Sequence, residues 1–189
     1  MEYVYNAPES ETDQRYMYHW EILRTALDKT VRKYGPYRMV PAKTMTEKRQ
    51  LAELRQATGE ITLMYLGTTR EMEHTLLPVR IPVDRNFGGY CVLLIRSEDQ
   101  ERMNNVRTID DLRKLSIGQG YGWIDVGIFT HNGFKVVTGS NYEGLFKMLV
   151  NKRFDVFSRS AVEISDEFEN RQPVLKNLKI VKLSPYSFL

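Results

Sequence analysis

The chain has 189 residues, 27 of them Lys or Arg and 24 Asp or Glu, which gives a formal net charge of +3. Hydrophobic residues make up 42% and charged residues 27%, so the chain is neither disordered nor too polar to bury a core. The charges are mixed in sign, and no stretch approaches the about eighteen apolar residues of a membrane-spanning helix. These features exclude a polybasic membrane anchor, a transmembrane span and an obvious nucleic-acid-binding stripe.

The few cysteine and histidine residues narrow the chemistry further. Cys91 is the one cysteine, so an internal disulfide, a CxxC pair and a cysteine zinc site are excluded. It lies in the apolar run 90–95, which predicts a buried, unreactive thiol. His19, His74 and His131 are far apart and lack metal-ligand spacing. We therefore expect neither a metal nor a cofactor.

In the first half of the chain, predicted strands and helices alternate, as is typical of α/β proteins. We expect strands over 2–5, 37–41 and 61–66, and helices over 16–34 and about 44–58. Thr44 and Glu47 have the spacing of a capping box at the start of the second helix, and Gly59 suits the position after its end. Pro78 and Pro82 exclude a central helix and indicate an edge or crossing segment.

The second half repeats this alternation. We expect strands over 90–96, 115–119, 134–137, 154–157 and 178–183, and helices over 108–114, 123–131, 142–149 and 161–170. The pair Gly88-Gly89 is either a hinge or an ordinary turn. Each half is thus predicted to be a small α/β unit, and the two are joined near residues 88–96.

A glycine-rich turn between a predicted strand and a predicted helix is a candidate anion site. Gly118, Gly120 and Gly122 fit neither the Walker A motif nor the dinucleotide fingerprint. Glycines let a ligand approach the backbone, and the amides at a helix N-terminus attract anions. The alternative is a plain tight turn.

Two arginines are candidate ligand-binding residues. Thr68 and Thr69 precede Arg70, and hydroxyls next to a guanidinium can clamp a carboxylate. Arg159 follows a predicted strand, at the end of the sheet where ligands gather in open α/β folds. The alternative for each is a solvated surface arginine.

The loop after the first strand carries Glu9, Asp13 and Arg15, a group that is usually only solvated. No signature such as GxSxG or HExxH is present. The sequence therefore predicts no catalytic residue.

Several segments, taken in order, resemble one known family. They are Thr68–Glu71 followed by Leu77–Pro82, Thr108–Leu112 before Ile117–Gly120, and Asn141–Phe146 with Lys152–Asp155. Their order and spacing resemble the type 2 periplasmic solute-binding proteins, which include the amino-acid-binding proteins of ABC importers. The resemblance spans nearly the whole chain, and its nearest branch is poorly characterised.

The resemblance implies an α/β fold of two lobes, each a small sheet flanked by helices, that clamp a small ligand for import or sensing without catalysis. Matched by position, Arg70 would hold a ligand carboxylate with help from Thr68 and Thr69, and Gln119, Gly120 and the amides before Trp123 would contact the ligand from the second lobe. The protein would be periplasmic or extracellular, with its signal peptide removed. Its partner would be a membrane permease or a signalling protein, and not a nucleic acid.

The sequence departs from the family in two places. Amino-acid binders place an acid shortly after the strand that holds Asp155, whereas Ser158-Arg159-Ser160 stands here. Together with Arg70, this favours an anionic ligand such as a dicarboxylate. The second departure is the C-terminus. Residues 1–89 would form an incomplete first lobe, 90–184 the second lobe and 185–189 the start of a return crossing, so either the rest was removed or another chain completes the lobe by dimerisation or strand exchange.

Three alternatives share this fold. The first is a sensory domain of a signalling protein. The second is a dehydratase-like enzyme that uses Glu9 as proton donor. The third is a degenerate binder that contacts only another protein.

Overall fold

The computed structural model describes residues 1–181 and divides the chain into two compact units, Met1–Asn86 and Phe87–Leu189. The boundary between the units falls at Asn86, whereas the sequence placed it after residue 89. The predicted return crossing, 185–189, lies outside the described residues. Among residues 1–181, no helix is both long enough and apolar enough to cross a membrane.

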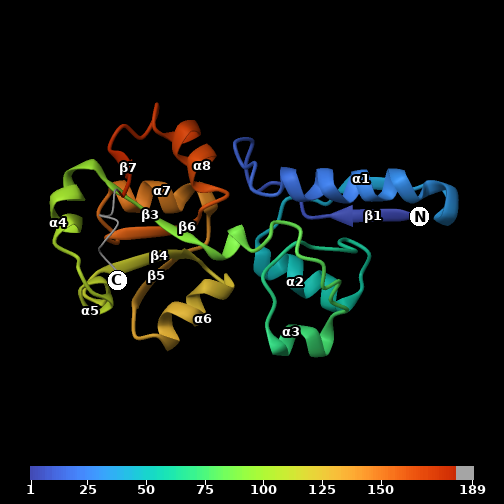
Figure 1. Cartoon of the computed structure of the whole chain (residues 1–189), viewed down its shortest axis with the longest axis horizontal. Coiled ribbons are helices and arrows are strands. Elements are labelled where there is room, and N and C mark those ends of the chain that lie inside the picture. The colour runs from blue at the N-terminus through green and yellow to red at the C-terminus, as the bar shows by residue number, and fades with distance from the viewer. Residues whose placement is uncertain (182–189) are drawn as a thin grey trace. The chain divides into compact units, whose positions relative to one another are not determined.

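The first unit contains a two-stranded parallel sheet and three helices (Figure 1). Its elements are β1 (Glu2–Tyr5), α1 (Met17–Tyr34), β2 (Arg38–Pro41), α2 (Glu47–Gln56) and α3 (Arg70–Thr75). The strands pair in register from Glu2 opposite Arg38 to Tyr5 opposite Pro41.

The strand predicted over 61–66 is wrong. Only one isolated parallel bridge forms there, between Leu63 and Tyr5. The Thr62 amide donates to the Val4 carbonyl at 2.8 Å, but the Val4 amide donates to the Thr62 hydroxyl, also at 2.8 Å. Because a side chain accepts the bond that a backbone carbonyl would accept in a ladder, pairing stops after one bridge.

The boundaries predicted for the second helix also differ from the structure. Thr46, not Thr44, precedes α2, and its side chain makes no capping hydrogen bond. The helix ends at Gln56, and the next residue, Ala57, takes the left-handed conformation with φ 51°. Gly59, with φ 86°, turns the chain two residues later. The capping box predicted from Thr44 and Glu47 is therefore wrong, because the helix begins at Glu47 itself.

Within residues 87–181, the second unit is built on a five-stranded mixed sheet with strand order β5-β4-β6-β3-β7. Its strands are β3 (Cys91–Arg96), β4 (Ser116–Gly120), β5 (Lys135–Gly139), β6 (Val156–Ser160) and β7 (Leu178–Ile180). Its helices are α4 (Gln100–Asn104), α5 (Ile109–Arg113), α6 (Ile124–His131), α7 (Tyr142–Val150) and α8 (Ile164–Arg171), with 3-10 turns at Phe87–Gly89 and Ser97–Asp99. The sequence predicted these strands and four of the helices within a few residues, and it missed α4 and the 3-10 turns.

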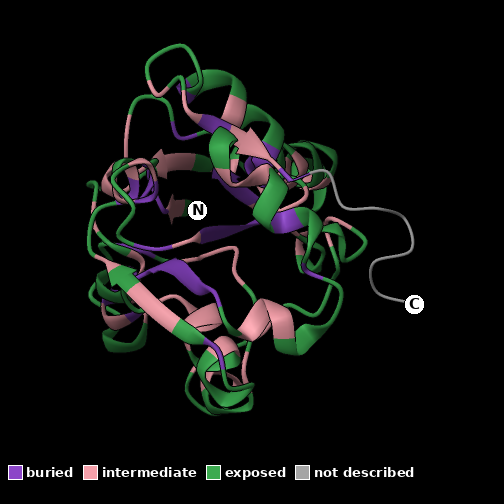
Figure 2. Cartoon of the chain, turned by 90° about the vertical axis from the view of Figure 1, so that its left-hand side faces the viewer, coloured by how far each residue is buried: buried purple, intermediate pink, exposed green. Residues whose placement is uncertain are grey.

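The central strands β4 and β6 are buried along nearly their whole length, and buried residues are purple in Figure 2. Leu94 and Phe157 pack with α7 and α8, whereas their neighbours Ile95 and Val156 belong to a second cluster with Met103. Adjacent residues of a strand point to opposite faces, so each central strand contributes to both clusters. Because the core packs against both faces of the central strands, it holds in place the ends of β4 and β6, where the candidate site lies.

The sequence predicts that Cys91 is buried, but the structure shows it exposed. Cys91 is exposed because β3 begins there, opposite Ser160 at the end of its antiparallel partner. Burial is complete only farther along the strand, at Leu94.

Candidate functional site

The first candidate region is the edge of the second unit's sheet at which β4 and β6 end. These strands run parallel, with Gly118 opposite Phe157, so Gln119 and Ser158 follow at the same level. Gln119 is fully buried, and its amide nitrogen donates to the Ser158 carbonyl at 3.4 Å. Its Oε1 has no hydrogen-bond partner among the described residues. The edge therefore holds a buried acceptor that needs a donor.

The glycines of the turn serve the packing of aromatic rings. A Cβ at Gly118 would lie 2.2 Å from the Phe154 ring, and one at Gly120 would lie 2.2 Å from the Trp123 indole. Gly122 has φ 89°, which explains its place in the turn. Trp123 thus packs directly against Gly120, and ligand binding at this turn stays a prediction.

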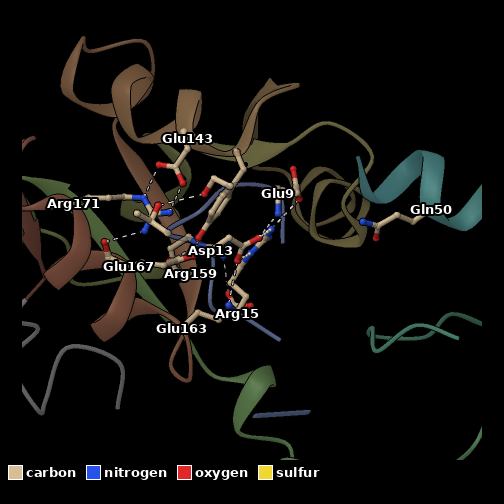
Figure 3. Close-up of polar contacts among 12 residues, drawn as sticks. Glu9, Asp13, Arg15, Gln50, Glu143, Arg159, Glu163, Glu167 and Arg171 are labelled. Atoms are coloured by element: carbon tan, nitrogen blue, oxygen red, sulfur yellow. Dashed lines mark hydrogen bonds and ion pairs between the residues drawn. The ribbon is translucent and has the colours of Figure 1, made fainter. Parts of the chain in front are cut away.

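The sequence predicts that Arg159 offers a free positive charge to a ligand, but in the structure this charge is paired with two carboxylates. Arg159 is 4% exposed in β6, and its Nε and one terminal nitrogen donate to the two oxygens of Glu167 at 2.8 and 2.7 Å. The same nitrogen donates to Glu163 at 2.7 Å (Figure 3). Burial alone would lower the pKa of Arg159, but the two carboxylates raise it above its ordinary value. Its charge is therefore compensated within the protein.

This ion pair belongs to a larger buried network. The Tyr142 hydroxyl donates to Glu167 at 2.5 Å, and Arg171 donates to the two oxygens of Glu143 at 3.0 and 2.6 Å. The Arg171 guanidinium lies 4.0 Å from the centroid of the Phe146 ring. The sequence reasoning missed the network, although residues 163, 167 and 171 follow the four-residue spacing of one helix face.

Trp123 is part of the same assembly. The Arg159 guanidinium lies 4.9 Å from its ring, and the ring stacks with Phe157 at an interplanar angle of 14°. The structure thus brings Gln119, Gly120, Trp123 and Arg159, all expected to bind ligand, to one edge of one sheet.

Asp125, in the first turn of α6, was not singled out by the sequence. It is half-buried, and no hydrogen bond or ion pair to it occurs within residues 1–181. Burial raises the pKa of Asp125, and the charge of Arg159 offsets part of that rise.

Desolvation also raises the pKa of the Cys91 thiol, which keeps the thiol protonated at neutral pH although the residue is exposed.

In the first unit, the charges expected to be solvated form a buried cluster. Arg15 donates to both oxygens of Asp13 at 2.8 Å and to Glu9 at 2.9 Å. Burial raises the pKa of Asp13, but the hydrogen bonds and charge of Arg15 more than reverse this and leave it below its ordinary value. The Glu9 carboxylate is thus engaged by Arg15.

The predicted carboxylate clamp lies at the start of α3. Thr69 caps the helix by accepting from the Met72 amide at 3.2 Å, and the Thr68 hydroxyl donates to the Thr69 carbonyl at 3.4 Å. Arg70 is exposed and forms no ion pair or hydrogen bond within the described part of the chain. Among the predicted residues of this unit, Arg70 is the one whose charge is available to a ligand.

A buried aromatic pair near the Arg15 cluster carries no signal in the sequence. His19 is 5% exposed and stacks on Tyr65, with 3.5 Å between ring centroids. The Tyr65 hydroxyl donates to Asp84 at 2.9 Å. Burial lowers the pKa of His19, and Asp84 offsets part of the effect. These residues are too far apart in sequence for any spacing rule to connect them.

Comparisons with known proteins define the fold. No protein-family model matches the chain, and no curated protein matches it. A substrate-binding protein of an amino acid ABC transporter matches with a TM-score of 0.66 and 13% identity over 99% of this chain and 80% of its own. AbpA from Streptococcus pneumoniae, an amino acid ABC transporter substrate-binding protein bound to L-arginine, matches with 0.66 and 15% over 97% and 76%. The GluR0 ligand-binding core from Nostoc punctiforme, in complex with L-glutamate, matches with 0.61 and 13% over 96% and 78%.

These matches assign the chain the two-lobed fold of the type 2 periplasmic binding proteins. The fold expected from the sequence is therefore confirmed. At these identities the likeness concerns the fold, and what the chain binds is a separate question.

Proposed function

We propose that the protein is a non-enzymatic solute-binding protein for a small, carboxylate-bearing molecule. The observation that carries this proposal is Arg70, an exposed guanidinium at the start of α3 without a described partner. Guanidinium groups bind carboxylates through paired hydrogen bonds. Neighbours in fold are described as bound to arginine or glutamate, which both carry such a group.

A second question is which chemical group the ligand carries besides its carboxylate. The preference for a dicarboxylate rested on Arg159 as a second free cation, and Glu163 and Glu167 compensate that charge. Two acceptors of the second unit lack a described hydrogen-bond partner near the ends of β4 and β6, the buried Oε1 of Gln119 and the Asp125 carboxylate. We therefore propose a ligand with one carboxylate and one hydrogen-bond donor, as in an amino acid, in preference to a dicarboxylate.

The test is a ligand panel measured by thermal shift and calorimetry. It contains L-arginine, L-glutamine, L-glutamate and succinate. A ligand at about 100 times its Kd stabilises the native state by about 2.7 kcal/mol, which raises Tm measurably. Arg70→Ala should weaken binding at least about tenfold, because a charged hydrogen bond contributes about 1.5–3 kcal/mol. Arg55→Ala, at another exposed arginine, is the matched control.

The outcomes separate the alternatives. Binding of succinate alone would restore the dicarboxylate, and equal loss in both variants would remove Arg70 from the site. Absence of binding across the panel would contradict the proposal and favour the degenerate, protein-contacting alternative. The dehydratase alternative lacks support, because Arg15 engages Glu9.

The partners and location follow from the same proposal. An extracytoplasmic binder would deliver its ligand to a membrane permease or report it to a signalling protein. Binding of the loaded protein, but not of the ligand-free protein, to permease-containing vesicles would support import.

We also propose that another copy or chain segment covers the first unit's sheet. No residue of β1 or β2 is buried, and a two-stranded sheet is marginal alone. Light scattering coupled to size exclusion tests this, and a monodisperse monomer would exclude exchange between copies.

A further inference from the structure

A hollow on the second unit lies apart from the residues discussed above. It has a volume of about 420 Å³ and lies between the end of β5 and the helix α7. It is lined by Thr138, Gly139, Ser140, Asn141, Gly144, Lys147, Met148, Asn151 and Arg153. No residue of this lining is acidic, and two are cationic.

The two cations are available to a partner. Lys147 and Arg153 are both exposed, and neither forms an ion pair or hydrogen bond through its side chain with another of the described residues. Several other cations of this unit are paired, among them Arg102 with Asp155 and Lys114 with Asp111. The hollow is thus a local positive surface on a chain of nearly balanced charge.

One wall of the hollow belongs to an edge strand. β5 is the first strand of the sheet order and pairs with β4, and no other described strand pairs with it. Its outer edge therefore offers unpaired backbone groups, which can template an added strand. Gly139 lets α7 pack closely against this end of β5, since a Cβ there would lie 2.8 Å from Leu145, and Met148 provides an adaptable apolar contact in the hollow.

The N-terminus of α7 does not make the hollow a phosphate site. Asn141 caps this helix by accepting from the Gly144 amide at 2.6 Å. That amide would otherwise be one of the free donors that bind phosphate at a helix start. The open edge and the rim cations favour an extended ligand over a compact one.

We propose that this β5–α7 hollow docks an extended acidic segment of a partner protein. The segment adds to the outer edge of β5 by backbone hydrogen bonds, and its carboxylates pair with Lys147 and Arg153. This is strand addition, in which the backbone gives affinity and side chains give specificity. This proposal does not rest on the ligand proposed for Arg70.

The test uses a fluorescent peptide of alternating Glu and Thr with both ends blocked, and a matched peptide with Gln for each Glu. Anisotropy should show binding of the acidic peptide to the full chain, weakening with salt. The double variant Lys147→Glu/Arg153→Glu should bind at least about tenfold more weakly. Lys176→Glu, at an exposed lysine elsewhere in this unit, should bind as the unchanged protein does.

Hydrogen exchange distinguishes strand addition from simple charge attraction. Bound acidic peptide should slow amide exchange at residues 135–139 of β5. Equal binding of the Gln peptide, or an equal loss in Lys176→Glu, would overturn the proposal. So would competition by inorganic phosphate at low concentration, which would indicate a small-anion site. Thermal melts of each variant show whether a loss of binding reflects unfolding.

Discussion

The buried pair between Arg159 and Glu167 gives the sharpest prediction for stability. Glu167 is 3% exposed and accepts two hydrogen bonds from Arg159 and one from the Tyr142 hydroxyl. Glu167→Ala removes all three and leaves a buried guanidinium with one remaining carboxylate, Glu163.

The expected loss is large because an uncompensated buried charge is costly. Removing one partner of a buried ion pair costs about 3–5 kcal/mol. Glu163→Ala removes one hydrogen bond from a carboxylate that is 16% exposed in its side chain, so we expect about 1–2 kcal/mol. For a unit of this size, each 1 kcal/mol lowers Tm by roughly 4–8 °C. Glu167→Ala should therefore lower Tm by more than about 10 °C, and the decrease in Tm for Glu163→Ala should be smaller than that for Glu167→Ala.

The assay is calorimetry or urea unfolding. It compares the stability of the two single variants with that of the double variant Arg159→Met/Glu167→Leu. The double variant removes both charges, so it should recover much of the stability lost in Glu167→Ala. If Glu163→Ala were as damaging as Glu167→Ala, or if the double variant lost the sum of its parts, the charge-compensation argument would fail.

Further predictions concern packing and acid stability. Gly118→Ala places a methyl group against the buried Phe154 ring, so we expect a loss of about 1–3 kcal/mol in urea unfolding. Gly127→Ala, in α6 with open space around it, should instead stabilise by about 0.5–1 kcal/mol, and the same sign for both variants would contradict the packing argument. The pKa of Asp13 is below its ordinary value, so its contribution is present above about pH 4 and is lost as the pH falls through the folded-state pKa. Asp13→Asn removes this contribution and leaves Arg15 less fully paired; Tm measured from about pH 6 to about pH 2 should fall less steeply than in the unchanged protein.

Much of the second unit could be predicted from local sequence. Helices of clear apolar periodicity, such as the one built on Leu145 and Leu149, lie where the spacing placed them, because one face of each is buried against the sheet. The strand over 61–66 failed because periodicity does not tell whether a neighbouring strand completes the ladder, and here Thr62 interrupts it.

The candidate site was likewise predictable from the sequence only in part. The sequence by itself determined the α/β class and the absence of an internal disulfide, and it singled out Arg70 and Arg159 as candidate ligand-binding residues. Only the tertiary structure decided which of the two arginines is free, because pairing depends on α8 folding back over β6 to bring Glu163 and Glu167 onto Arg159. The net charge of +3 could not show this, since the charge that a ligand meets depends on which groups compensate one another within the fold.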